Sequence, residues 1–209
     1  MNVFLGAYRE VLEVAAATVG VDLVIVEDKE TSADCVQFSE ERGVRLKKLR
    51  RGEDLAESFP EKVDLAVIMG FTRLLKEPLI RRCGTVVNFH PGIVEVNRGR
   101  HGLLTAALKG HGMMGVTCHL IDSEEIDAGP IIAQVRLPID YGRDFDANHA
   151  RLRKTLKPLA RLVLEEYRER GTVTALLWTP DADSYHPPLS PDELRRVLEA
   201  PSLGAVRER

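Results

Sequence analysis

Two polar side chains, Asn88 and His90, stand two positions apart where an apolar run of the sequence ends. Pro91 follows at once and disfavours helical geometry at His90, so both side chains can lie on the same side of an extended chain. An amide and an imidazole aimed at one spot can stabilise the negative oxygen that forms when a carbonyl is attacked. From the spacing alone, a histidine satisfied within a turn and capped by Asn88 is the simpler interpretation.

A carboxylate follows in the run Ile126-Asp-Ala-Gly-Pro130, between two apolar segments. Asp127 with Gly129 two positions later is typical of a tight turn, in which glycine is free to adopt positive φ. Two interpretations stay open for this aspartate. It either stabilises its own turn, or it faces a cleft where it can polarise a nearby imidazole.

The elements that must position these residues alternate between short apolar runs and helical patterns. We expect strands at residues 2–5, 22–26, 44–49, 64–69, 84–89, 115–121 and 130–137. We expect helices at residues 8–19, 31–42, 54–59, 76–83, 103–109 and 148–170. This alternation predicts an α/β fold, a doubly wound, mostly parallel sheet with helices on both faces. Such sheets bind ligands beyond the carboxyl ends of their strands, here after Met69 and Val87.

Domain organisation and composition narrow the function classes. We expect one domain over residues 1–178 and an arm with a short helix over 179–209. A formal net charge of -3 and 5% aromatic residues argue against a nucleic-acid partner. No apolar run is long enough to cross a bilayer, and the first residues do not form a secretory signal. Three widely spaced cysteines fit free thiols in a reducing compartment, so we expect a cytoplasmic protein.

Three segments together resemble the folate-dependent formyltransferase family: Val87-Asn-Phe-His-Pro-Gly92, Gly115-Val-Thr-Cys-His119 and Ile126-Asp-Ala-Gly-Pro-Ile-Ile-Ala-Gln134. The family includes glycinamide ribonucleotide, methionyl-tRNA and sugar N-formyltransferases and formyltetrahydrofolate deformylase. The resemblance covers about a third of the chain. It implies that Asn88, His90 and Asp127 form the catalytic trio. Asn88 and protonated His90 would donate to the oxyanion, while Asp127 would hold the imidazole and assist proton removal from the amine.

The resemblance also implies where the formyl donor, 10-formyltetrahydrofolate, binds. The segment after the fourth strand would frame the pterin ring through backbone and apolar side chains, and the loop before Asp127 would form the opposite wall. The residues implied are Met69, Phe71, Arg73, Leu74, Leu75, Ile121 and Ile126. Two interpretations stay open for His119. It either contacts the catalytic side chains and supports them, or it is a strand residue that only packs beneath the site.

Departures from the family concern the acceptor. The Gly-Ser-Asn-rich phosphate loop of glycinamide ribonucleotide formyltransferases is replaced by Gly6-Ala-Tyr-Arg9, although Arg9 could still meet an anion. After His90-Pro91, the substrate segment contains Gly92 and an unusual Glu95. We therefore expect a small primary amine as acceptor, an amino sugar or a specialised metabolite. Glycinamide ribonucleotide, or water in a deformylase, are the alternatives. Family members often pair, so a homodimer is a further expectation.

Two other classes of function fit the sequence less well. A metal enzyme would use Cys83, His90, His101, His111, Cys118 and His119, but these lack the close paired spacings of zinc sites, so we expect no metal. A binding protein that has lost catalysis would need no trio, and the trio is intact.

Overall fold

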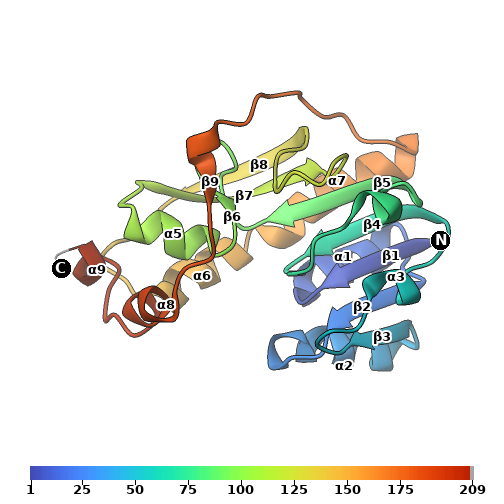
Figure 1. Cartoon of the computed structure of the whole chain (residues 1–209), viewed down its shortest axis with the longest axis horizontal. Coiled ribbons are helices and arrows are strands. Elements are labelled where there is room, and N and C mark those ends of the chain that lie inside the picture. The colour runs from blue at the N-terminus through green and yellow to red at the C-terminus, as the bar shows by residue number, and fades with distance from the viewer. Residues whose placement is uncertain (208–209) are drawn as a thin grey trace.

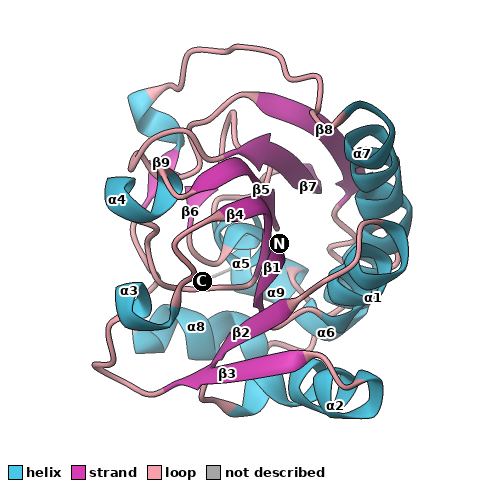
Figure 2. Cartoon of the chain, turned by 90° about the vertical axis from the view of Figure 1, so that its right-hand side faces the viewer, coloured by secondary structure: helices cyan, strands magenta, loops and turns pink. Residues whose placement is uncertain are grey.

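The computed structural model describes residues 1–207 as a sheet of seven strands covered by helices (Figures 1 and 2). Its strands run in the order β3-β2-β1-β4-β5-β7-β8. The first five are parallel to one another, and β7 is antiparallel to both of its neighbours, β5 and β8. The strands of this sheet are β1 (Asn2–Gly6), β2 (Leu23–Glu27), β3 (Arg45–Leu49), β4 (Val63–Met69), β5 (Cys83–His90), β7 (Met113–Leu120) and β8 (Ile131–Pro138). The predicted mostly parallel α/β fold is confirmed.

Helices lie on both faces of the sheet, with α1 and α7 on one and the short α3 and α4 on the other (Figure 2). The helices are α1 (Arg9–Thr18), α2 (Ala33–Arg42), α3 (Leu55–Ser58), α4 (Glu77–Ile80), α5 (Gly102–Leu108), α6 (Phe145–Arg153), α7 (Leu156–Arg170), α8 (Pro191–Leu198) and α9 (Gly204–Arg207). Alternation along β1 explains the two layers, because Val3 and Leu5 enter one apolar cluster and Phe4 the other. No helix among the described residues is long and apolar enough to cross a bilayer.

The single helix expected over residues 148–170 is wrong, because the chain forms α6 and α7 with a break at Lys154 and Thr155. Pro158 is the physical reason. It has no N–H to donate to the carbonyl of Lys154 four residues earlier, and its ring would clash with that carbonyl in a continuous helix. Thr155 instead bonds back to Leu152 through both its N–H and its hydroxyl.

Residues 179–207, most of the predicted arm, follow α7 in the chain and return across the molecule (Figure 1). Its first part holds a 3-10 turn (Ala182–Ser184) and a two-residue strand, β9 (Tyr185–His186). β9 pairs in parallel with β6 (Arg98–Gly99). The arm then continues into α8 and α9. Val197 of α8, Leu203 before α9 and Val206 of α9 are buried in the same apolar cluster as Phe4. Residues 208–209, the end of the predicted arm, lie outside the described residues.

Candidate active site

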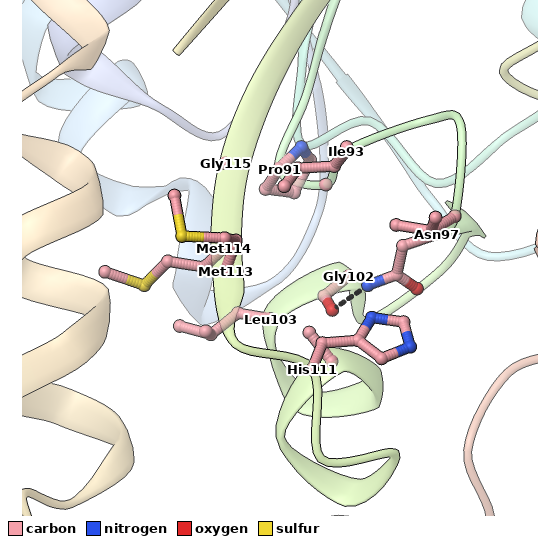
Figure 3. Close-up of a pocket in the computed structure, with 12 residues that line it drawn as sticks. Pro91, Ile93, Asn97, Gly102, Leu103, His111, Met113, Met114 and Gly115 are labelled. Carbon is pink, nitrogen blue, oxygen red and sulfur yellow. Dashed lines mark hydrogen bonds between the residues drawn. The ribbon is translucent and has the colours of Figure 1, made fainter. Parts of the chain in front are cut away.

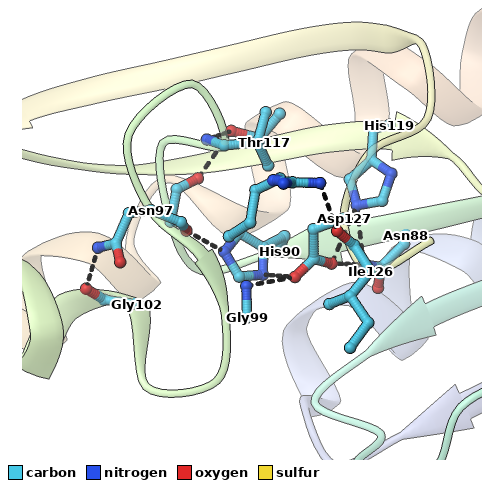
Figure 4. Close-up of polar contacts among 12 residues, drawn as sticks. Asn88, His90, Asn97, Gly99, Gly102, Thr117, His119, Ile126 and Asp127 are labelled. Atoms are coloured by element: carbon cyan, nitrogen blue, oxygen red, sulfur yellow. Dashed lines mark hydrogen bonds and ion pairs between the residues drawn. The ribbon is translucent and has the colours of Figure 1, made fainter. Parts of the chain in front are cut away.

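Strand β5 and its neighbour β7 place the first three polar side chains of the site. Asn88 and His90 lie two positions apart on one face of β5, and Phe89 between them points into the apolar core. Asn88 lies opposite His119 of β7 in the antiparallel register, which brings these two side chains together. The loop between β7 and β8 then carries Asp127 against them (Figure 4).

The carboxylate of Asp127 is the centre of this cluster, with partners on both oxygens. Oδ2 lies 3.2 Å from Nδ1 of His90 and accepts from the Gly99 N–H at 2.9 Å. Oδ1 accepts from Nδ2 of Asn88 at 3.2 Å and lies 3.3 Å from Nε2 of His119. The structure thus brings together the three side chains expected to form the trio.

The electrostatics of the cluster favour an ionised aspartate. Burial would raise the pKa of the Asp127 carboxyl, but the neighbouring His90 and His119 rings and the Gly99 N–H together hold that pKa well below its ordinary value. A carboxylate ionised throughout the neutral range can stabilise positive charge on the adjacent imidazole.

The ring of His90 is buried and faces an acceptor at each nitrogen. Nδ1 faces Asp127, and Nε2 lies 2.9 Å from the carbonyl oxygen of Asn97. A ring that donates from both nitrogens carries a positive charge, which the carboxylate balances. In this arrangement both donors of His90 already have protein acceptors.

The amide of Asn88 is oriented by the same network. Its Nδ2 donates to Asp127 and lies 3.0 Å from Nε2 of His119, because the opposite orientation would set two acceptor oxygens against each other. The ring of His119 has its Nδ1 2.8 Å from the carbonyl oxygen of Leu120, and its Nε2 faces both the Asn88 amide and Oδ1 of Asp127. Of the two interpretations of His119 that the sequence left open, the structure supports direct contact with the site.

Sequence reasoning missed two backbone partners, the carbonyl of Asn97 and the N–H of Gly99. Both belong to the segment that leaves β5 after His90 and returns at β6, and backbone groups carry no sequence signal. The buried Asn97 side chain donates to the carbonyl of Gly102 and closes this segment. A small hollow on its far side is lined mostly by apolar residues, among them Pro91, Ile93, Leu103 and Met114 (Figure 3).

The two expected walls of the folate slot lie side by side. Phe71, Leu75 and Ile121 belong to one apolar cluster, and the Glu77 N–H of α4 donates to Oε1 of Glu124 in the opposite loop at 2.6 Å. Around them, Met69 is buried in the core, whereas the side chains of Leu74 and Ile126 are 50% and 38% exposed. The guanidinium of Arg73 donates to the carbonyls of Arg50 and Glu53, away from Asp127.

The residues expected to contact the acceptor are more scattered. Gly92 lies beside His90, but Gly6 is needed where β1 approaches the backbone of Met69, at φ 146°. Arg9 forms ion pairs with Glu13 and Glu41 and lies over Phe38, so its guanidinium faces α1 and α2. Glu95 pairs with Arg136 and accepts from Gln134. Arg9 and Glu95 are therefore not among the contacts of the Asp127 cluster.

Metal-binding side chains are not grouped in the part of the chain that the structure describes. No set of three or more His, Cys, Asp or Glu residues within 1–207 is placed to hold a metal ion.

Comparison with known proteins places this geometry in context. The family model for formyl transferase matches residues 14–162. A phosphoribosylglycinamide formyltransferase of Mycobacterium tuberculosis is 36% identical over 97 residues, which are 46% of this chain and 45% of that protein. The aligned region therefore spans less than half the length of this curated relative.

Solved structures of two kinds share the fold. The N-formyltransferase of Helicobacter canadensis, in complex with folinic acid and dTDP-3-aminofucose, superposes with a TM-score of 0.73 at 17% identity, covering 93% of this chain and 72% of that one. Phosphoribosylglycinamide formyltransferase of Streptococcus pneumoniae has a TM-score of 0.69 at 26% identity, covering 79% of this chain and 96% of that one.

Proposed function

Because the chain belongs to the formyl transferase family, we propose that it transfers a formyl group from 10-formyltetrahydrofolate to the primary amine of a small molecule. The observation that carries this proposal is the cluster of Asn88, His90 and Asp127 at the carboxyl end of β5. Ligands of open α/β sheets bind beyond these strand ends. The chemistry also suits these side chains, because acyl transfer to an amine needs hydrogen-bond donors for an oxyanion and an acceptor for a proton.

Residues 71–75 and the loop before Asp127 lie side by side and suit the formyl donor. Phe71, Leu75 and Ile121 give these segments the apolar character that a flat pterin ring needs, and the half-exposed Leu74 lies in the first of them. When bound there, 10-formyltetrahydrofolate supplies a carbonyl carbon whose oxygen becomes negative as the amine attacks. The first segment and the Asp127 cluster are linked, because Arg100 donates to the Thr72 carbonyl at 2.7 Å and Gly99, which precedes Arg100, donates to Asp127.

The residues of the cluster then have distinct roles. Positively charged His90 donates to the developing oxyanion once its Nε2 exchanges the Asn97 carbonyl for the substrate oxygen, and Asn88 assists from β5. Asp127 keeps His90 charged and accepts the proton that the attacking amine releases, directly or through water. The bond between the amine and the formyl carbon forms first and gives the oxyanion. When the oxyanion collapses to a carbonyl, the carbon–nitrogen bond to the folate breaks, and the proton taken from the amine goes to the folate nitrogen.

The acceptor proposed is an amino sugar or another amine of specialised metabolism, and the start of α1 supports it. The ring of Tyr8 packs against Gly70, where an added Cβ would lie 2.7 Å from it. Burial lowers the pKa of His149, so its neutral ring can accept from the Tyr8 hydroxyl 3.3 Å away. An aromatic side chain thus covers the helix end that could otherwise hold a phosphate. This favours an amine other than glycinamide ribonucleotide.

A panel of amines tests the proposal. The protein is incubated with 10-formyltetrahydrofolate and amino sugar nucleotides, glycinamide ribonucleotide or other primary amines, and products are read by mass spectrometry. We expect the mass of one formyl group to appear on an amino sugar or a related amine. Formate released without any amine would instead indicate a deformylase, and no reaction in any arm would contradict the proposal.

Gly92→Ala tests whether the segment after β5 positions His90. The added methyl group would overlap Nε2 of His90 and lie 2.7 Å from the Asn97 carbonyl oxygen. We expect kcat to fall about 100-fold, because small displacements of reacting groups cost that much. Gly112→Ala is the matched control, since its added Cβ would have no atom within 4 Å, and it should keep wild-type turnover. Equal kcat in the two variants would show that this close approach does not hold the imidazole.

A further inference from the structure

Arg98 in β6 is buried, with 5% of the residue exposed, and its guanidinium donates to two separate segments of the chain. In the loop before Asp127, Nη1 donates to Oε1 of Glu125 at 2.9 Å and to the carbonyl of Ile126 at 3.3 Å. In the C-terminal arm, Nε donates to Oγ of Ser184 at 2.9 Å and Nη2 to the carbonyl of Asp181 at 3.3 Å. One side chain therefore joins β6, the Asp127 loop and the arm.

The contact with Ile126 bears directly on the geometry of Asp127. Asp127 has a φ of 49°, in the left-handed region that side chains other than glycine rarely adopt. The orientation of the peptide unit between Ile126 and Asp127 sets this angle. A strained backbone conformation persists only where the surrounding structure restrains it. Arg98 supplies such a restraint, because its hydrogen bond to the Ile126 carbonyl fixes that peptide unit.

The residue that follows Arg98 holds the other end of Asp127. The Gly99 N–H donates to Oδ2, the same oxygen that faces His90. Gly99 has a φ of 95°, and a Cβ there would overlap the His186 carbonyl of β9. Two consecutive residues thus fix the backbone before Asp127 and its carboxylate, and the close approach of the arm requires the glycine.

The arm is needed for this arrangement because it satisfies half of the Arg98 contacts. Without Asp181 and Ser184, the Nε and Nη2 donors of this buried cation would have no acceptors, which is costly in free energy. Glu125, its carboxylate partner, is 62% exposed and balances the charge only weakly. The position of Arg98 therefore depends on neutral acceptors of the arm.

The geometry points to Arg98 as a positioning residue for Asp127, and to the arm segment 181–186 as the part of the chain that completes the active site through it. This inference rests on the proposed function for its effect on turnover. Catalysis would then require segment 181–186, which follows all the strands of the main sheet along the chain. This segment contributes no side chain to the trio.

Arg98→Gln in the full chain tests the inference by kinetics. We expect kcat to fall about 100-fold through displacement of Asp127, while the KM for 10-formyltetrahydrofolate changes less than about twofold. Arg98→Lys should recover part of kcat, because an ammonium reaches fewer of the acceptors. Arg195→Gln on α8, an exposed arginine paired with Asp192, is the matched control and should match the wild type. Wild-type kcat in Arg98→Gln would overturn the inference.

Hydrogen exchange gives a readout independent of activity. The Gly99 amide should exchange at least about tenfold faster in Arg98→Gln than in the wild type, since its acceptor Asp127 has moved. Ser184→Ala removes a single acceptor from the guanidinium and should lower kcat about fivefold, which keeps the test decisive if Arg98→Gln does not fold. Unchanged Gly99 exchange in a folded Arg98→Gln variant, or unchanged kcat in Ser184→Ala, would overturn the inference. Absence of formyl transfer by the wild type would instead contradict the proposed function, and the exchange measurement would still decide the role of Arg98.

Discussion

Asp127→Asn is expected to lower kcat for formyl transfer about 1,000-fold, because it removes both the counter-charge of His90 and the proton acceptor. An asparagine fills the same space, but its amide nitrogen is a donor and must replace one of the two carboxylate oxygens. With the oxygen kept toward His90 and Gly99, the amide nitrogen faces Nδ2 of Asn88, which is also a donor. The uncharged residue no longer favours the doubly protonated His90 ring, so oxyanion stabilisation is lost as well.

Steady-state kinetics and folate binding measured together check this expectation. The Kd for the formyl donor should stay near the wild-type value, because the substitution leaves the apolar side chains Phe71, Leu75 and Ile121 unchanged. Asp122→Asn is the matched control, an exposed carboxylate in the same loop, and should leave kcat unaltered. A turnover of Asp127→Asn close to that of the wild type would remove Asp127 from the mechanism.

The same substitution has a consequence for stability against pH. Since the folded-state pKa of Asp127 is lowered, its ionised form stabilises the fold above the ordinary aspartate pKa of about 3.9, and this contribution is lost as the pH falls through the folded-state value. Denaturant unfolding from neutral to acidic pH should show a shallower loss of stability in Asp127→Asn than in the wild type. Parallel curves would show that the carboxylate is not held in this state.

His90→Gln is the second substitution with a large expected effect, a fall in kcat of about 1,000-fold. Glutamine can donate a hydrogen bond from the same strand position but cannot carry the positive charge that Asp127 balances. If the imidazole and the carboxylate act as one unit, the double variant His90→Gln/Asp127→Asn should be no slower than the slower single variant.

Single-turnover rates of the four proteins in this cycle separate the possibilities. Saturating amine and formyl donor isolate the chemical step from binding and release. A double variant whose loss equals the product of the two single losses would show that His90 and Asp127 act independently, against the ion pair at 3.2 Å. Melting temperatures of all four proteins control for loss of the buried pair.

Much of the fold follows from the sequence because its signals are local. The buried strands contain short apolar runs, such as Leu65 to Met69 in β4. Gly43 ends α2 in the left-handed conformation, as its position after a helical pattern predicts. The break between α6 and α7 also has a local cause, Pro158, which a helical pattern of apolar residues does not reveal. The start of α6 also has a local cause. The Asp144 carboxylate accepts from the Ala147 N–H, so the helix begins at Phe145, three residues before the start that the apolar pattern predicts.

The site is predictable only in part, for a physical reason. The chemistry of Asn88, His90 and Asp127 can be inferred from residue type and from resemblance, and the structure brings them together. The partners that hold them are backbone groups of residues 97 and 99 and a guanidinium whose acceptors lie far along the chain. Two-residue strands such as β6 and β9 have no periodicity, so their pairing is decided by tertiary contacts alone.

Translation order gives the link between Arg98 and the arm a temporal consequence. A nascent polypeptide leaves the ribosome from its N-terminus, and its early elements can fold while later ones are still being made. Ser184 lies 86 positions after Arg98, so the guanidinium has no complete set of acceptors until those later codons have been read. A ribosome-stalled intermediate ending before residue 181 would contain every member of the trio. It would lack the acceptors Asp181 and Ser184 that hold Arg98 against the loop of Asp127.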